Sequence, residues 1–492
     1  MDRLKDNDGN YDRTFRILVI ALASFVTGLA WRIRGDGPFG GSLGMMVPAI
    51  VLNLVILYAF GHFKKISSAE IGLMIIAMAI TAAGWGTINS QTTGIFTHEA
   101  LPDSSTQIMI NPLSGCFAVF VIGFGWVPLW SATIGRFFSD QKYKSREFLV
   151  RILIYFAASY LSMATVAHLI MPLVAPGPYG VFVEGLTAEG YDMIPWQAYM
   201  THFKNNDWLE AIPGGRNYGS MINNLSQCFG AIVLYFYMRY AYKDKTAAKI
   251  HIMLCLIFGL SILIADVWLF WDRGGLWRTS LIPPEWLHGW SMWEYSTGFL
   301  AGGLTMWYLF RQKPPSISEG ETEDDLGVNG EGDGEQRDIQ ENVGHDHFIE
   351  ERWIPFWRFF AAWGFVCVFS WVNPLGGELN RTYETTFPIQ MFGAEFELTF
   401  RIIVIAVAFL IFLPISILIL KDKVRLPDWS IQKWAIVDLM IFLHLFCVVY
   451  FWADSWATFI TNISTVVNSL MVSSYFAVII LIITIGFKYA KT

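Results

Sequence analysis

Apolar runs long enough to cross a lipid bilayer recur along the whole chain. A transmembrane helix needs about 20 predominantly apolar residues, and about twelve such runs alternate with short polar segments. The pattern predicts an all-α fold, a polytopic membrane helical bundle with about 12 transmembrane helices. The predicted spans lie near residues 14–32, 41–61, 69–89, 112–136, 149–172, 219–241, 250–271, 290–310, 354–372, 398–420, 432–453 and 465–487.

The basic residues give these spans an orientation. With the N-terminus in the cytoplasm, the inner loops and both tails carry 26 of the 34 Lys and Arg residues, as the positive-inside rule requires. We therefore expect both the N-terminus and the C-terminus to be cytoplasmic. The expected location is the plasma membrane, which in a bacterium is the inner membrane. The first apolar run lacks a small-residue processing site, so it is not expected to be a cleaved signal.

An acidic segment separates eight predicted spans from four. Residues 314–350 hold twelve acidic side chains, and low hydrophobicity with high net charge predicts disorder. Without this segment the formal charge changes from −7 to +4, so the acidity of the chain says nothing about a substrate. We expect a membrane domain over 1–312, an acidic disordered cytoplasmic linker over 313–350 and a second membrane domain over 351–492.

The composition excludes several classes of protein. Only 15% of the residues are charged, whereas a soluble protein carries about a quarter. The five cysteines fall within predicted spans and none has a neighbour at metal-ligand spacing, so neither a disulfide framework nor a metal site is expected. The chain has no phosphate-binding loop or hydrolase nucleophile motif, and no basic patch for nucleic acid. We therefore expect no cofactor and no nucleic-acid partner, with the lipid bilayer as the main surrounding.

The segment WRIRGDGPFGGSLG, residues 31–44, contains the glycine spacing of a dinucleotide-binding fingerprint. That motif requires a preceding strand and a soluble βαβ unit, whereas here a predicted transmembrane helix precedes it. The glycines instead permit a sharp reversal between the first two spans. The following helix N-terminus, near Arg32 and Arg34, is a candidate anion site.

Polar side chains with chemical potential gather at the outer ends of the predicted helices. The outer side holds seven Arg but only one Lys, although either residue would serve as a topological charge. An Arg guanidinium binds carboxylate or phosphate through two parallel hydrogen bonds, so this bias indicates specific pairing. The candidate substrate-binding residues are Arg32, Arg34, Asp36, Asp266, Asp272, Arg273, Glu294, Glu378 and Arg381.

Ionisable residues at membrane depth are few. A charge in hydrocarbon costs several kcal/mol, so such residues are expected to face the bundle interior and to serve function. Asp266 and Asp438 are the candidates for ion coupling, and Glu294 lies near the outer end of its span. Apart from Asp438, the inner halves of the spans are expected to be poor in polar groups.

Two functions account for this pattern; a third, an assembly or scaffold protein, is consistent with it but does not explain the arginines. One is a transporter of a polar, anionic or sugar-like small molecule that binds near the outer face. The alternative is a membrane-embedded transferase that acts at the outer leaflet on a lipid-linked, phosphate-bearing substrate, with Asp36, Glu294 or Glu378 as general base. A scarcity of inner polar groups favours the transferase, whereas the number of spans favours transport. The longest outer loop, 176–218, is long enough to cap a pocket, and the oligomeric state stays open.

Overall fold

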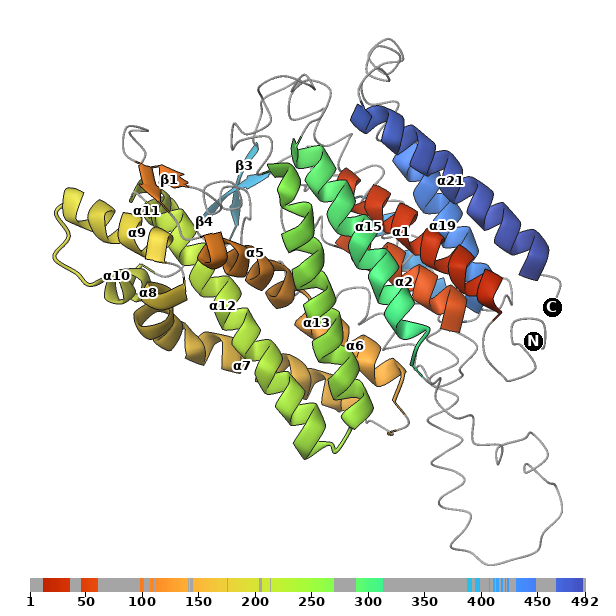
Figure 1. Cartoon of the computed structure of the whole chain (residues 1–492), viewed down its shortest axis with the longest axis horizontal. Coiled ribbons are helices and arrows are strands. Elements are labelled where there is room, and N and C mark those ends of the chain that lie inside the picture. Colours follow the sequence, from red (N-terminus) through yellow and green to blue (C-terminus); the bar gives the residue numbers. More distant parts are fainter. Residues whose placement is uncertain are drawn as a thin grey trace, which may run out of the picture. The chain divides into compact units, whose positions relative to one another are not determined.

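The computed structural model describes about half of the chain, mainly as helices (Figure 1). The described residues form two packing units, and each is presented by itself. They are 12–35, 46–60, 98–100, 107–109, 112–139, 141, 145–174, 176–202, 206–212, 214–269, 289–312, 387–391, 394–398, ten positions between 407 and 423, 431–447 and 466–489.

The first unit contains the long N-terminal helix, most of the central helices and the last helix. Four helices form one packed group, in which α1 lies along α15 and also contacts α21, while α13 packs against α15 (Figure 1). The last helix therefore joins the first, although the acidic linker separates them in the sequence. These helices are α1 (Arg13–Gly35), α13 (Lys245–Ala265), α15 (Gly289–Leu309) and α21 (Val466–Tyr489).

Helix α1 approaches α15 closely because small residues line the contact. A methyl group placed at Gly298 or Gly302 would collide with the carbonyl oxygen of Thr27 or Ala23, respectively. Small residues allow helix backbones to approach one another in membranes, where packing drives association. The Tyr295 and Ser474 hydroxyls, 2.7 Å apart, form a hydrogen bond between α15 and α21.

A second group of helices in this unit also packs on α13. Helices α5 and α6 contact one side of it, and α12 contacts both α7 and α5. The side chain of Asp244 accepts a hydrogen bond from the Ala247 amide and so caps the first turn of α13. These helices are α5 (Pro112–Trp126), α6 (Pro128–Phe137), α7 (Ser145–Thr165) and α12 (Gly215–Phe236).

The predicted span near 112–136 is a bent pair of helices. Helices α5 and α6 meet at Val127 at an angle of 54°. Pro128 follows at the first position of α6. Proline has no backbone N–H, which the first turn of a helix does not need. The same missing donor prevents α5 from continuing through Pro128. Helix α7 also deviates from regular geometry, passing through a π-helical turn, η3 (Val166–Ile170), into the short helix α8 (Met171–Val174). The C-terminal end of α12 passes similarly into η4 (Tyr237–Ala241).

The sequence predicts residues 176–218 as a loop, but the structure differs. They contain three short helices, α9 (Pro176–Ala188), α10 (Pro195–Thr201) and α11 (Asn206–Ala211), before α12 begins. Aromatic contacts hold this segment together, including a stacked pair of His202 and Trp208 rings 3.8 Å apart. Short polar stretches with interspersed aromatic residues do not show a clear helical period, which is why the sequence pattern missed them.

The regular elements of the described residues are helices, as predicted, apart from two short antiparallel ribbons. In the first unit β1 (His98–Ala100) pairs with β2 (Gln107–Met109), and in the second unit β3 (Phe387–Met391) pairs with β4 (Ala394–Leu398). Both lie in segments that the sequence assigns to outer loops. The second unit also contains α19 (Ile431–Cys447), and the boundary between the units falls within α2 (Met46–Phe60).

The described helices support a helical membrane protein. Four are long and apolar enough to cross a bilayer, and the bent pair of α5 and α6 is a candidate fifth span. The four are Arg13–Ile33, Leu149–Val174, Lys245–Leu269 and Asn468–Ile485. Helices α12 and α15 coincide with the predicted spans 219–241 and 290–310. The predicted spans near 69–89 and 354–372 lie outside the described residues.

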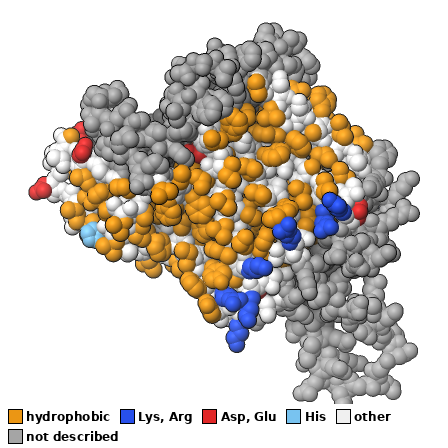
Figure 2. All heavy atoms as spheres, in the orientation of Figure 1, with side chains coloured by type: hydrophobic (Ala, Val, Ile, Leu, Met, Phe, Trp, Pro, Cys, Tyr) orange, Lys and Arg blue, Asp and Glu red, His pale blue; other side chains and the backbone are white. Residues whose placement is uncertain are grey.

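The surface of these helices is unusually apolar. Along α7 and the short helix α8 that follows it, the side chains of Leu153, Leu161 and Leu173 are 68–81% exposed. Figure 2 shows a broad area of hydrophobic side chains with Lys and Arg gathered along one edge. A water-soluble protein rarely exposes an apolar area of this extent, whereas lipid solvates it. The basic edge is the arrangement expected at a cytoplasmic membrane surface.

Candidate functional site

The predicted residues Arg32 and Glu294 meet where α1 ends and α15 begins. Arg32 Nη1 donates a hydrogen bond to Glu294 Oε2 at 3.3 Å, and both side chains are only 11% exposed. The close packing of α1 on α15 brings these residues together although 262 positions separate them. The result is a buried ion pair at the end of the bundle that the basic residues assign to the outside.

Asp266 lies at the corresponding end of α13 and has no exposed surface. Within the described part of the chain, neither carboxylate oxygen of Asp266 has a hydrogen-bond partner. The indole of Trp293 faces this carboxylate, although the two groups do not meet hydrogen-bonding geometry. Trp293 immediately precedes Glu294 on α15, so the Asp266 carboxylate and the Arg32–Glu294 ion pair lie beside the same turn of α15.

Aromatic rings close the interior around these groups. Trp31, beside Arg32 on α1, stacks on Trp126 of α5 with ring centroids 6.4 Å apart and also contacts Phe258 of α13. The indole nitrogens of Trp31 and Trp293 are buried without hydrogen-bond partners among the described residues. Buried polar groups are nearly always satisfied. Two indole donors and a carboxylate acceptor therefore make this end of the bundle the candidate site for water or a polar ligand.

We refer to Trp31, Arg32, Asp266, Trp293 and Glu294 as the outer cluster. It offers a guanidinium for an anionic group, two carboxylates for a cation or hydroxyl groups, and two indoles for stacking. Of the nine substrate-binding residues expected from the sequence, the structure describes the side chains of Arg32, Asp266 and Glu294 and brings these three to one end of the bundle.

The other expected site residues are not part of this geometry. Arg34 belongs to the last turn of α1, but its side chain is not among the described ones. The ion-coupling candidate Asp438 is half-buried on α19 in the second unit. The remaining five, Asp36, Asp272, Arg273, Glu378 and Arg381, lie outside the described residues.

The inner half of the first unit contains polar groups that the sequence did not single out. His251, near the start of α13, is fully buried and its ring nitrogens contact the Ser131 hydroxyl at 2.7 Å and the Ala231 carbonyl at 3.0 Å. The thiol of Cys255 lies 3.3 Å from the same hydroxyl. We refer to His251, Ser131 and Cys255 as the inner cluster. Its signal in the sequence is faint, because His251 follows Lys249 at the polar margin of a predicted span.

A buried ion pair lies on α7 near the same end. Arg151 Nε and Glu147 Oε2 are 3.0 Å apart, one helical turn from each other, and the two side chains are 2% and 1% exposed. In the sequence both residues lie at the cytoplasmic margin of the predicted span 149–172, where a basic residue serves only to orient the helix. The expectation that the inner halves of the spans are poor in polar groups is therefore wrong for α6, α7 and α13. Local sequence cannot reveal which side of a helix faces the interior of a bundle.

Neither cluster has the composition of a metal centre. Among the described residues, no three His, Cys, Asp or Glu side chains come close enough together to hold a metal ion. Comparison with protein-family models, with characterised proteins and with solved structures finds no match for the chain.

Proposed function

We propose that the chain is a membrane transporter of a polar small molecule, with its substrate site at the outer cluster. The observation that carries this proposal is the Asp266 carboxylate, which is fully buried and has no hydrogen-bond partner among the described residues. An ionisable group of this kind in a membrane helix is costly and marks an ion or substrate pathway.

The residues of the outer cluster have distinct roles in this proposal. Arg32 binds a carboxylate or phosphate of the substrate through its planar guanidinium, exchanging Glu294 for the ligand. Trp31 and Trp293 donate hydrogen bonds from their indole N–H groups or stack on a sugar ring. Asp266 binds the coupling cation, a proton or Na⁺. The substrate is therefore an anionic or sugar-like solute.

The inner cluster favours transport over a transferase. Alternating access needs polar surfaces towards both sides of the membrane, whereas an enzyme of the outer leaflet needs none towards the cytoplasm. The transferase alternative depended on a scarcity of inner polar groups, and the burial of Glu147, Arg151 and His251 removes that argument. In this proposal the complete chain has about twelve spans and lies in the plasma membrane with both termini inside.

Ligand binding followed by uptake tests the proposal. The purified full-length chain is screened by thermal shift with a hexose, a hexose phosphate, a dicarboxylate and inorganic phosphate. The stabilising solute is then radiolabelled, and its uptake into proteoliposomes is driven by a proton or Na⁺ gradient. We expect Asp266→Asn to reduce this uptake at least about tenfold, and Arg32→Lys to abolish stabilisation because an ammonium lacks the bidentate fork.

Matched controls separate binding from folding. Glu184→Gln removes an exposed carboxylate on α9, and Arg311→Lys makes the same change as Arg32→Lys at an exposed position. Both are expected to retain wild-type uptake. Undiminished uptake by Asp266→Asn would contradict the assigned site. A polyprenyl phosphate is screened beside these solutes, and stabilisation by it alone, with no uptake of any solute, would favour the transferase over the transporter.

A further inference from the structure

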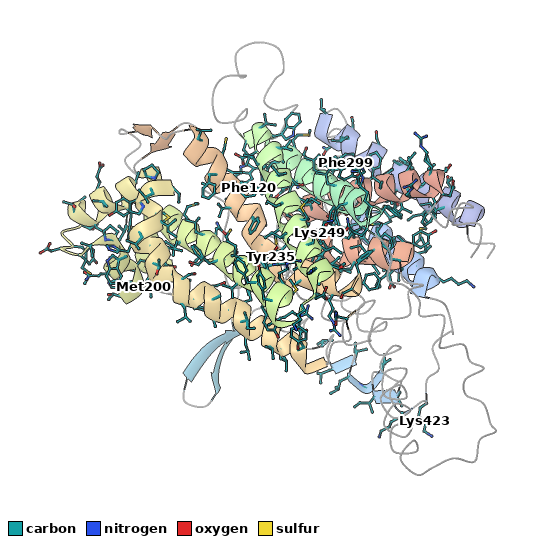
Figure 3. The ribbon with its side chains drawn as sticks, turned by 60° about the horizontal axis from the view of Figure 1, so that its bottom comes forward. Phe120, Met200, Tyr235, Lys249, Phe299 and Lys423 are labelled. Atoms are coloured by element: carbon teal, nitrogen blue, oxygen red, sulfur yellow. The ribbon has the colours of Figure 1, made fainter. Side chains whose placement is uncertain are left out.

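The inner cluster lies where the bent helix pair crosses α13. His251 is near the α13 end marked by Lys249, which Figure 3 labels. Ser131 is in the first turn of α6, three residues after Pro128 and four after the bend at Val127. The side chains of His251, Ser131 and Cys255 have no exposed surface. A titratable ring is thus enclosed at the one sharp bend among the described spans.

The hydrogen bonds of His251 define its neutral form. A carbonyl oxygen only accepts, so the contact of 3.0 Å with Ala231 requires the hydrogen of the neutral ring to be on Nε2. Nδ1 then accepts a hydrogen bond, and the Ser131 hydroxyl 2.7 Å away is its donor. In this state the hydroxyl hydrogen points towards the ring.

The same atoms also accommodate the charged form. If Nδ1 gains a proton, it donates to Ser131 Oγ, and the hydroxyl hydrogen turns towards the Pro128 carbonyl, 3.0 Å from Ser131 Oγ. That carbonyl also lies near the imidazole. Every ring N–H has an acceptor in both states, so the geometry does not leave a buried donor unsatisfied on protonation.

We propose that His251 is a proton-binding site that controls the bend between α5 and α6. The incoming proton forms the Nδ1–H bond, and the Ser131 hydrogen stays on its oxygen while changing its acceptor from Nδ1 to the Pro128 carbonyl. The proton comes from a hydronium ion, which becomes water; no covalent bond of the protein breaks and no electron is transferred. Hydrogen bonds from Ser to a carbonyl one turn earlier bend membrane helices, which links the proton to the geometry of the span.

The charged and titratable surroundings set the conditions for this site. Arg151 on α7 lies within electrostatic range of His251, and Glu147, paired with Arg151, offsets its charge. The titratable and charged neighbours are Glu147, Arg151 and Tyr155 of α7, Cys228 of α12 and Cys255 of α13.

The inference rests on the proposed transport function only for the use of the proton, which the carrier would couple to transport in addition to the cation at Asp266. The site is therefore tested with protons alone. The full-length chain, labelled with ¹⁵N-histidine, is placed in lipid nanodiscs, and its imidazole nitrogens are followed by NMR from neutral to acidic pH. The chain has nine histidines, and the signal lost in His251→Gln identifies the ring.

We expect His251 to have one protonated nitrogen near neutral pH and two after acidification, reversibly. Ser131→Ala removes the relay hydroxyl and should change the proton affinity of His251 about tenfold or more, a pKa change of about one unit. Ser131→Thr retains the hydroxyl and should keep the proton affinity of His251 at its wild-type value. Ser261→Ala is the matched control, because Ser261 is buried on α13 and its hydroxyl binds only the Ile257 carbonyl among the described groups.

A second label reads the bend itself. Labelling proline with ¹³C at the carbonyl and leucine with ¹⁵N restricts the NMR signals to the four Pro–Leu peptide bonds of the chain. The signal that disappears in Leu129→Ile belongs to the Pro128–Leu129 bond. Its carbonyl shift should follow the His251 titration in the wild-type chain and stay constant in His251→Gln. A shift that is equally pH-dependent in His251→Gln would overturn the link to the bend.

Two results would overturn the proposal of a proton site. One is a His251 ring that keeps its neutral form over the whole pH range in which the chain is folded. The other is an unchanged titration in Ser131→Ala with only a loss of thermal stability, which indicates a packing role. If His251 titrates as expected but no solute is taken up, the proton site stands and the transport function fails. If solute uptake is unchanged in His251→Gln and the ring does not titrate, the transport function stands and the proton site fails.

Discussion

At the scale of single residues, burial gives ionisable groups in this chain their importance. Arg32, Asp266 and His251 all belong to the first unit, and each lies on a helix whose other faces are largely apolar. Desolvation makes a buried charge costly unless a partner compensates it. Glu294 compensates Arg32 in this way, whereas the described residues provide no hydrogen bond for Asp266. The contrast separates a paired charged group from one without a hydrogen-bond partner among the described residues.

The Glu147–Arg151 pair allows a test of this reasoning away from the outer cluster. Arg151→Met leaves Glu147 as a buried charge and should lower the free energy of unfolding by about 3–5 kcal/mol, the usual cost of breaking a buried pair. The double variant Glu147→Gln/Arg151→Met should recover most of this loss, because neither charge remains. Thermal or denaturant unfolding in detergent measures both.

The outcome for the double variant decides between two roles. Recovery of stability would show that the pair compensates its own desolvation. If the double variant is as unstable as Arg151→Met, the pair contributes contacts that charge balance does not replace. Leu149→Ala, which trims an exposed side chain of the same helix, serves as the control and should change stability little.

At the scale of elements, close contact between helices depends on residues without side chains. Gly302 of α15 faces the Ala23 carbonyl of α1, which is backbone and cannot move aside as a side chain would. Gly259 and Gly123 bring α13 and α5 together in the same manner. These contacts position α1, α15 and α13 and thereby bring the outer cluster together.

Glycine-to-alanine changes should therefore have opposite effects at two positions. Gly302→Ala should destabilise the protein by about 1–3 kcal/mol, because the added methyl group overpacks the α1–α15 contact. A methyl group added at Gly180 in α9 has no neighbouring atom within 4 Å. Gly180→Ala should therefore leave stability unchanged or raise it, since alanine favours the helix. Unfolding temperatures of the two variants, measured side by side, check the difference. Equal effects would contradict the assigned packing of α1 on α15.

At the scale of the whole molecule, the distribution of charge predicts how the chain lies in the membrane. The basic residues at the start of α13 and in the turn before it, Lys243, Lys245 and Lys249, are exposed, and the positive-inside rule assigns this end to the cytoplasm. Glu184 on α9, in the segment assigned to the outer side, is exposed as well. The two ends can therefore be distinguished by chemical access.

Cysteine labelling tests this orientation. A membrane-impermeant maleimide applied to intact cells should label Glu184→Cys and should not label Lys243→Cys until the membrane is permeabilised. The unmodified chain is the background control, because its five cysteines fall within predicted spans. Labelling of Lys243→Cys in intact cells would reverse the orientation and with it the assignment of the outer cluster.

The sequence by itself determined the class of the protein and the positions of its main helices. Apolar length is a local property, and 14–32, 250–271 and 465–487 coincide with α1, α13 and α21 to within a few residues at most boundaries. The bend at Pro128, the two ribbons and the helices within 176–218 were not predicted. Short elements carry weak periodicity, and their geometry depends on neighbours that are distant in the sequence.

Only the tertiary structure decided which polar residues act together. The sequence listed Arg32 and Glu294 among nine candidates, but the pairing of residues 262 positions apart depends on how α1 packs along α15. It did not single out Arg151, at the margin of a predicted span, or His251, because hydropathy averages over all faces of a helix and does not distinguish lipid from bundle interior. Burial, which sets the energy of a charge, exists only once the helices have packed.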